Sequence, residues 1–218
     1  GSEGVDHVFC GGLTPGTLPL LCGDPGAGKT TLLLQCFQSL GRRRVKCLYV
    51  TGEMDLTQLS KLAARFGKMP PRVTAFYGDD LDTILDKIDE TKPDVVVIDS
   101  IQMIQCSDEL QVGSSASVTT AMREFMTFSK ANRQVAFIII GHINKDGAIA
   151  GPQTLNHYVD ASIHLAGNKK TKRRVLRCDS KNRNGDTPRR WHFDMTKDHG
   201  LVSAAQDEQE IEDAAVDA

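Results

Sequence analysis

Short runs of apolar residues alternate with helical patterns along most of the chain. Runs with the length and composition of buried strands occupy Leu18–Cys22, Lys46–Thr51, Val95–Asp99 and Ala136–Gly141. Between these runs, apolar residues recur at helical spacing over Thr30–Leu40, Leu56–Phe66, Asp80–Glu90 and Val118–Asn132. Near-continuous apolar strands separated by helices are typical of a parallel sheet that is covered by helices on both faces.

The carboxyl-terminal third of the chain predicts strands with little room for helices between them. These strands are Ala161–Ala166, Arg173–Cys178 and Trp191–Met195. We therefore expect hairpins, so that a mostly parallel twisted α/β sheet ends in antiparallel strands at its C-terminal edge. A chain of 218 residues suits one large domain. We assign residues 1–203 to that domain and expect residues 204–218 to form a disordered acidic tail.

Charge is distributed unevenly along the chain. The net charge is −2, but the tail holds six acids and no base (Asp207, Glu208, Glu210, Glu212, Asp213 and Asp217). The rest of the chain is therefore weakly basic, and ten of its bases fall between Lys169 and Arg190. A basic body with an acidic tail is compatible with a polyanionic ligand. An ordinary solvated surface with a frayed end is the alternative.

Other features of the composition exclude some classes of protein. The longest apolar runs are far shorter than the roughly 20 residues that span a bilayer, and no signal-peptide pattern begins the sequence. The six cysteines form no C-x-x-C pair, which argues against a zinc ribbon and against a disulfide scaffold. We expect a cytoplasmic protein without a membrane partner.

One motif predicts a nucleotide site directly. Residues 23–30 match G-x-x-x-x-G-K-[ST], directly after a predicted strand and at the start of a predicted helix. Glycines let backbone N–H groups turn toward phosphate oxygens, and the helix N-terminus adds partial positive charge. We expect Lys29 to reach the β- and γ-phosphates of ATP and Thr30 to bind Mg²⁺. The expected nucleotide-binding residues are Gly23, Asp24, Pro25, Gly26, Ala27, Gly28, Lys29, Thr30 and Thr31.

Two carboxylates follow predicted strands at the edge where a parallel sheet presents its ligand. Asp99 ends a buried strand, and we expect it to hold the Mg²⁺ shell opposite Thr30. Glu53 follows the Lys46–Thr51 strand, from which it would orient a water for attack on the γ-phosphate. The alternatives are a turn or cap role for Asp99 and a helix-start role for Glu53, near Asp55.

His142 ends the Ala136–Gly141 strand. A hydrogen-bond donor at this point could contact the γ-phosphate and report its presence to the following loop. A structural histidine remains the alternative.

Together, these motifs resemble RecA-type P-loop ATPases, and most of all the RadA (Sms) family of bacterial DNA-repair proteins. Gly11–Gly16 is similar to the segment that opens this fold, Tyr49–Glu53 resembles the family's Y-V-S-G-E, and Val97–Gln102 matches its second nucleotide motif. Gly141–Pro152 nearly repeats G-H-V-T-K-E-G-x-I-A-G-P. The resemblance spans roughly Val8 to Val202. It implies a RecA-like fold, with ATP and Mg²⁺ held between subunits of a homo-oligomer.

The same resemblance implies residues that act on a neighbouring subunit. Residues 181–185 are similar to the family's K-N-R-F-G signature, by which Lys181 and Arg183 would reach the neighbour's ATP. On an extended strand, their spacing would place both side chains on one face. Asn184 stands where the family has an aromatic residue, and Met54 stands where it has a second acid. Because no zinc module or Lon-protease-like domain is present, we expect a trimmed core or a compact relative of the phage type.

Two loops are candidates for binding DNA, Met103–Ser117 and Ile143–Pro152. Lys145, Asp146 and Gly147 in the second loop are the expected contacts with phosphates. Neither loop contains an aromatic residue, so base stacking is not expected. Arg42–Arg44 more simply satisfies the carbonyls and dipole at the end of a helix.

The resemblance therefore implies a DNA-stimulated ATP hydrolase that acts on single-stranded DNA as a motor or helicase in recombination, repair or replication. Its assembly would be a hexameric ring or a filament, with a recombinase or a replication protein as a further partner. Two alternatives stay open: a KaiC-like ATP-dependent regulatory assembly without DNA, and a loader that does not translocate.

Overall fold

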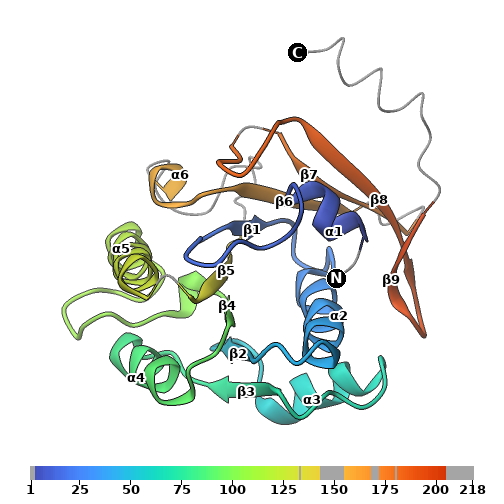
Figure 1. Cartoon of the computed structure of the whole chain (residues 1–218). Helices are drawn as coiled ribbons and strands as arrows, with labels where there is room; N and C mark the ends of the chain where they lie inside the picture. Colours follow the sequence, from blue (N-terminus) through green and yellow to red (C-terminus); the bar gives the residue numbers. More distant parts are fainter. Residues whose placement is uncertain (1–2, 133, 143–154, 168–171, 180, 205–218) are drawn as a thin grey trace.

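A nine-stranded sheet with the order β3-β2-β4-β5-β1-β6-β7-β8-β9 forms the centre of the protein (Figure 1). The computed structural model describes residues 3–132, 134–142, 155–167, 172–179 and 181–204. The strands are β1 (Leu20–Cys22), β2 (Cys47–Thr51), β3 (Val73–Tyr77), β4 (Val95–Asp99), β5 (Ala136–Ile140), β6 (Ser162–Gly167), β7 (Arg173–Cys178), β8 (Arg189–Thr196) and β9 (Gly200–Ser203). The helices are α1 (Glu3–Val8), α2 (Lys29–Arg42), α3 (Leu56–Ala64), α4 (Leu81–Thr91), α5 (Ser115–Ala131), α6 (Leu155–Tyr158) and the short 3₁₀ helix η1 (Ile101–Met103).

The first six strands in this order run parallel, and their carboxyl ends meet at one edge of the sheet. Thr51 of β2 is in register with Asp99 of β4, and Leu21 of β1 is in register with Ile140 of β5. Every residue of β2, β4 and β5 is buried, which explains their continuous apolar sequences. The residues that follow these strands are thereby brought to a common edge.

Alternate residues of the sheet face two separate hydrophobic cores. On one face, α1, α2 and α3 cover a core that includes Tyr49, Val97 and Ile138. On the other face, α4, α5 and α6 cover a core that includes Val96 and Phe137. The parallel sheet thus lies between two helical layers, as the sequence predicted (Figure 1).

Strands β6 to β9 extend the sheet beyond its parallel part through antiparallel pairs. Helix α1 packs against β8, where the Cβ that Gly4 lacks would lie 2.2 Å from Cδ1 of Trp191. The predicted hairpin strands are confirmed. β9 was missed because its four residues follow β8 directly and carry no separate apolar run.

Two other elements were also missed. Edge strand β3 is mostly exposed and has no inward alternation that sequence could detect. α1 is short, and its burial depends on Trp191, which is far away in the sequence. Among the described residues, no helix is long and apolar enough to cross a bilayer.

The α4–α5 core provides a test of the fold. Phe137 is fully buried, and its ring centroid lies 5.8 Å from that of Phe125 and 6.1 Å from that of Phe128. We expect Phe137→Ala to lower the free energy of unfolding by about 3–5 kcal/mol, because it leaves a cavity between these rings. Denaturant unfolding measures the change. Tyr77→Ala removes a ring that is 51% exposed and should cost no more than about 0.5 kcal/mol; equal losses would contradict this packing.

Candidate active site

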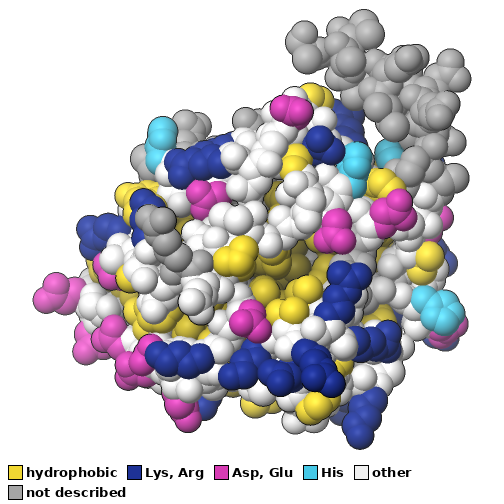
Figure 2. Space-filling model, viewed as in Figure 1, with side chains coloured by type: hydrophobic (Ala, Val, Ile, Leu, Met, Phe, Trp, Pro, Cys, Tyr) yellow, Lys and Arg dark blue, Asp and Glu magenta, His cyan; other side chains and the backbone are white. Residues whose placement is uncertain are grey.

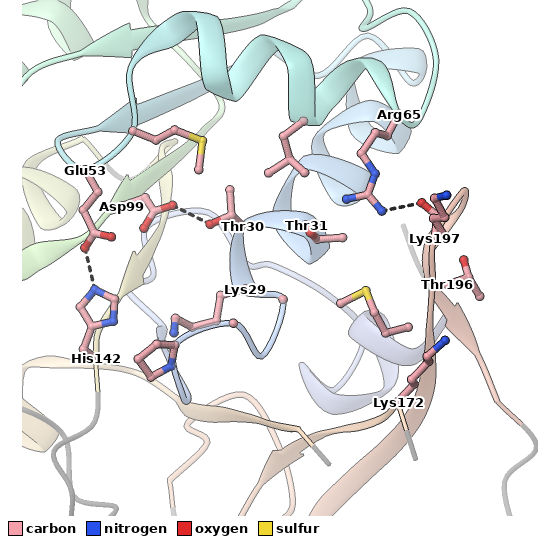
Figure 3. A pocket seen from close by; sticks show the side chains of 16 residues that line it. Lys29, Thr30, Thr31, Glu53, Arg65, Asp99, His142, Lys172, Thr196 and Lys197 are labelled. Carbon is pink, nitrogen blue, oxygen red and sulfur yellow. Dashed lines mark hydrogen bonds and ion pairs between the residues drawn. The ribbon is translucent and has the colours of Figure 1, made fainter. Parts of the chain in front are cut away.

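A cavity of about 710 Å³ opens at the edge where β1, β2, β4 and β5 end (Figure 3). Its wall combines residues 25–31 with the residues that follow β2, β4 and β5. The outer wall comes from α3 and from the turn between β8 and β9. The size suits a nucleotide-sized ligand.

The phosphate loop connects β1 to α2, and it leaves the N-terminus of α2 open toward the cavity. Gly28, the N-cap residue of α2, has a φ of 108° and provides no side-chain cap. In contrast, Asp55, Asp80 and Ser114 cap α3, α4 and α5 with side-chain hydrogen bonds. Uncapped N–H groups at a helix start favour an anion. The glycine at the N-cap therefore leaves the first N–H groups of α2 available to bind a phosphate.

Two contacts fix the conformation of the phosphate loop. The Cβ that Gly23 lacks would lie 2.2 Å from the carbonyl oxygen of Leu165, so the loop can pass β6 only with glycine at this position. Arg174 of β7 is buried, and its Nε donates a 2.9 Å hydrogen bond to the carbonyl of Ala27. The antiparallel part of the sheet therefore supports the loop from outside the cavity.

Lys29 is buried at the start of α2, and its ammonium group contacts the loop itself. Nζ donates to the carbonyl oxygens of Gly23 at 2.7 Å and Asp24 at 3.2 Å. Burial lowers the pKa of Lys29, while the charges of Asp99 and Glu53 oppose this shift. The lysine is thus positioned at the loop by two carbonyls and by nearby carboxylates.

Asp99 is buried and is held by two hydroxyl donors. Its Oδ2 accepts from Tyr49 Oη at 2.6 Å and from Thr30 Oγ1 at 3.0 Å. Burial raises the pKa of Asp99, and these hydrogen bonds counteract the shift. Thr30 and Asp99 are 69 positions apart in the sequence, and both were predicted to lie at the Mg²⁺ site. The structure brings them into direct contact.

This donor set fits a magnesium ion. A hydroxyl and a carboxylate beside a phosphate-binding loop are hard oxygen ligands, and Mg²⁺ commonly takes only one or two protein ligands together with substrate phosphates and water. Among the described residues there is no cluster of three or more His, Cys, Asp or Glu side chains that could hold a metal. The few protein ligands are consistent with a metal that arrives with a nucleotide.

Glu53 and His142 face each other at the inner end of the cavity (Figure 3). Oε1 of Glu53 lies 2.6 Å from Nε2 of His142, and it also accepts a hydrogen bond from Ser100 Oγ. The bond with His142 is the main cause that lowers the pKa of Glu53, so its carboxyl group is ionised at neutral pH. Both bonds use Oε1, which leaves Oε2 as the oxygen that can accept from a water.

The backbone of His142 connects this end of the cavity to η1. The N–H of His142 donates to Oε1 of Gln102 at 3.4 Å. Gln102 lies just before the loop Met103–Ser117, and His142 lies just before residues 143–152. Both loops expected to bind DNA therefore start from residues in mutual contact. Lys145, Asp146 and Gly147 lie outside the described residues.

The outer part of the cavity is formed by residues that sequence analysis did not identify. Met54, Leu62 and Met195 give it an apolar lining. Arg65 donates a 2.6 Å hydrogen bond to the carbonyl of Lys197 and so connects α3 to the β8–β9 turn (Figure 3). No local motif marks these residues, because they meet only when the hairpin folds back over α2.

Tyr49, Ser100 and Arg174 were missed as well, although two of them carry a signal. Tyr49 places a hydroxyl inside a fully buried strand, and such a group needs a partner. Ser100 directly follows Asp99. Arg174, by contrast, was hidden within a run of basic residues.

Lys181 and Arg183 are absent from the described lining of the cavity. They lie where β1 and β6 begin, at the opposite edge of the sheet from the phosphate loop. Arg183 Nη1 pairs with Asp160 Oδ1 at 3.0 Å, and Asp160 Oδ2 accepts from the Leu18 N–H at 2.8 Å.

The strand expected at residues 181–183 is limited to one antiparallel bridge, in which the Ser162 N–H donates to the Lys181 carbonyl at 2.9 Å and the Arg183 N–H donates to the Asp160 carbonyl at 2.8 Å. Asn182 makes an isolated bridge with Ala161, and a turn begins at Arg183. The side chain of Asn182 instead reaches back to the carbonyl of Val8 at 3.4 Å and to Cys10 Sγ at 3.2 Å. The backbone pairing thus ends at the turn, and the Asn182 side chain adds a contact with the N-terminal segment.

Comparison with protein families and curated proteins identifies relatives. A family model described as an AAA domain matches residues 5–148. The chain is 37% identical over 197 residues to the DNA repair protein RadA of Haemophilus influenzae, covering 90% of this chain and 43% of the relative. It is 41% identical over 185 residues to RadA of Chlamydia pneumoniae, covering 84% and 40%. The chain therefore spans less than half the length of these relatives.

Two solved structures share the fold. A crystal structure of the RadB recombinase superposes with a TM-score of 0.72 at 22% identity, covering 94% of this chain and 98% of that one. A KaiC-like protein from Pyrococcus horikoshii gives a TM-score of 0.74 at 19% identity, with the same coverage of 94% and 98%. These similarities confirm the predicted mixed sheet with antiparallel C-terminal strands.

The hydrogen bond from Tyr49 to Asp99 can be tested by Tyr49→Phe. The substitution leaves a buried carboxylate short of one donor, so the free energy of unfolding should fall by about 1.5–3 kcal/mol. Denaturant unfolding at neutral pH without nucleotide measures the change. Tyr77→Phe makes the same chemical change at an exposed position and should have no measurable effect. Similar values for both variants would show that the Tyr49 hydroxyl does not stabilise Asp99.

Proposed function

The chain belongs to the AAA-domain family and is a RadA-like ATPase of the RecA superfamily, and on this premise we propose that it couples ATP hydrolysis to movement on single-stranded DNA. The observation that carries the proposal is the contact between Glu53 and His142. It joins the residue that faces the substrate to the start of a loop expected to bind DNA. Such a motor would act in DNA repair, recombination or replication.

ATP binds with its phosphates at the open N-terminus of α2. The N–H groups of residues 26–31 and the Lys29 ammonium balance the charge of the phosphates. Thr30 and Asp99 would hold Mg²⁺, which neutralises charge on the β- and γ-phosphates when bound. Tyr49 and Thr30 keep Asp99 oriented, and Arg174 keeps the Ala27 peptide of the loop in place.

Glu53 positions the attacking water through Oε2, while His142 and Ser100 hold Oε1. Attack of the water on the γ-phosphorus breaks the bond to the bridging oxygen and releases ADP and phosphate. When a γ-phosphate approaches, it competes for the His142 ring as a hydrogen-bond acceptor. A shift of His142 would then move the start of residues 143–152, where Lys145, Asp146 and Gly147 are proposed to contact DNA phosphates.

Lys181 and Arg183 complete the site of a neighbouring subunit. Because they lie at the opposite edge of the sheet from the phosphate loop, they can reach an ATP only on another copy of the chain. Contact between two different edges is head-to-tail, and it generates a ring or a filament. An arginine supplied in this way accelerates hydrolysis by a factor of roughly 10³–10⁵. Arg183 would exchange Asp160 for phosphate on assembly.

We expect ATP turnover to rise when single-stranded DNA is added. Lys29→Ala should abolish turnover both with and without DNA, because it removes the cation that reaches the phosphates. A titration with a single-stranded oligonucleotide under steady-state conditions measures both effects. Turnover that stays constant across the titration, with no DNA binding even at low salt, would favour the KaiC-like regulatory alternative over the motor.

His142→Ala separates coupling from hydrolysis. The variant should keep most of its basal turnover but lose stimulation by DNA, since Glu53 is retained while its link to the loop is removed. Glu53→Gln should lose both activities and still bind nucleotide, because the carboxamide keeps the shape of the side chain. Full DNA stimulation in His142→Ala would contradict the proposed coupling.

A further inference from the structure

Six exposed basic side chains gather around the C-terminal end of α2, at the far end of this helix from the phosphate loop. We call them the α2-end patch: Arg42, Arg43, Arg44, Lys46, Lys68 and Arg72. Figure 2 shows dark-blue side chains along the lower part of the drawn face, over the end of α2 and the loops beside it in Figure 1. The patch combines two segments separated in sequence by β2 and α3.

Backbone contacts hold these two segments together. The N–H of Cys47 donates to the carbonyl of Arg72 at 2.9 Å. The Cβ that Gly41 lacks would lie 2.9 Å from Cβ of Pro70 and 2.7 Å from Cγ2 of Val73. Lys68 and Arg72 are thus fixed beside the end of α2.

Counter-charges are scarce around the α2-end patch. None of its six side chains forms an ion pair with an acid in the described part of the chain. The sequence contains no Asp or Glu from Arg42 to Gly52 or from Leu56 to Gly78. Asp94 lies at this edge, where its Oδ2 accepts from the Lys46 N–H at 2.7 Å. The patch therefore has a net positive field.

Termination of α2 does not by itself account for the basic residues of the patch. Arg44 has a φ of 69°, and the Val45 N–H donates to the Leu40 carbonyl at 3.2 Å in a helix-terminating turn. Glycine is the usual residue at such a position, and a β-carbon there is strained. The macrodipole of α2 favours bases at its end, but it does not explain Lys68 and Arg72, which come from another segment.

We propose that the α2-end patch binds the phosphate backbone of duplex DNA. The patch contains no aromatic side chain, so it cannot favour a single strand by stacking on bases. Lysine and arginine side chains on rigid backbone suit a duplex, which carries about one negative charge per 1.7 Å of helix axis. The site lies away from the ATP cavity, and phosphate contacts make it independent of sequence.

The test compares two variants with the same change of net charge. Arg44→Gly/Arg72→Gln removes two cations from the patch, whereas Arg123→Gln/Lys130→Gln removes two exposed cations of α5. Binding of a short labelled duplex is measured by fluorescence anisotropy over a salt series without nucleotide. The patch variant should bind about tenfold more weakly, and the slope of log K against log salt should fall by about 2.

Two further variants separate loss of duplex binding from loss of stability and from loss of ATP turnover. Arg44→Gly alone should weaken duplex binding while raising the melting temperature, because glycine relieves the positive φ. Lys29→Ala should bind the duplex normally, so failure of this inference is distinguishable from failure of the proposed motor.

Three results would overturn the proposal. The first is duplex binding by the patch variant that equals that of its charge-matched control. The second is an equally large loss for a single-stranded oligonucleotide, which would remove the assignment to duplex. The third is loss of polyglutamate binding with duplex binding retained, which would assign the surface to an acidic protein partner.

Discussion

The site depends on keeping opposite charges in place inside a partly buried cavity. Burial raises the pKa of Asp99 and lowers that of Lys29, so each group would tend to lose its charge if it were alone. Two hydroxyl donors and the mutual attraction of these groups oppose that tendency. The parallel register of β2 with β4 makes this possible, because it brings the ends of the two strands to the same point. In the proposed mechanism, phosphate binding, water orientation and coupling to the loops all rely on this arrangement.

The candidate functional residues lie at two opposite edges of the sheet. One edge holds the phosphate loop, Glu53 and His142, whereas Lys181, Arg183 and the α2-end patch lie at the other. In the proposed assembly, a single copy carries each half of the catalytic site at a different end. Head-to-tail contact would bring the halves together, which would account for the distance of Lys181 and Arg183 from the cavity of their own chain.

Much of the fold and the inner site could be predicted because the signals were local. The phosphate loop, the buried strands and the acids that follow them are contiguous patterns, and the structure brings Lys29, Thr30, Glu53, Asp99 and His142 together. The outer cavity could not be predicted, since Arg65 and Lys197 meet only through tertiary folding. The roles of the two runs of basic residues also could not be predicted from the sequence. Among the described bases between Lys172 and Arg190, Arg174 contacts Ala27 and Arg177 pairs with Asp179 within the chain, whereas Arg42–Arg44, expected to cap a helix, joins an exposed patch.

Mixing two inactive variants tests the shared ATP site most directly. Lys29→Ala lacks a working phosphate loop but keeps Lys181 and Arg183, and the double variant Lys181→Ala/Arg183→Ala has the reverse defect. Each should be inactive alone, and an equal mixture should recover about a quarter of the wild-type rate, since random assembly pairs an intact loop with an intact neighbour at that frequency. A mixture that stays inactive although mass measurement shows mixed assemblies, or full turnover by the double variant alone, would contradict the account.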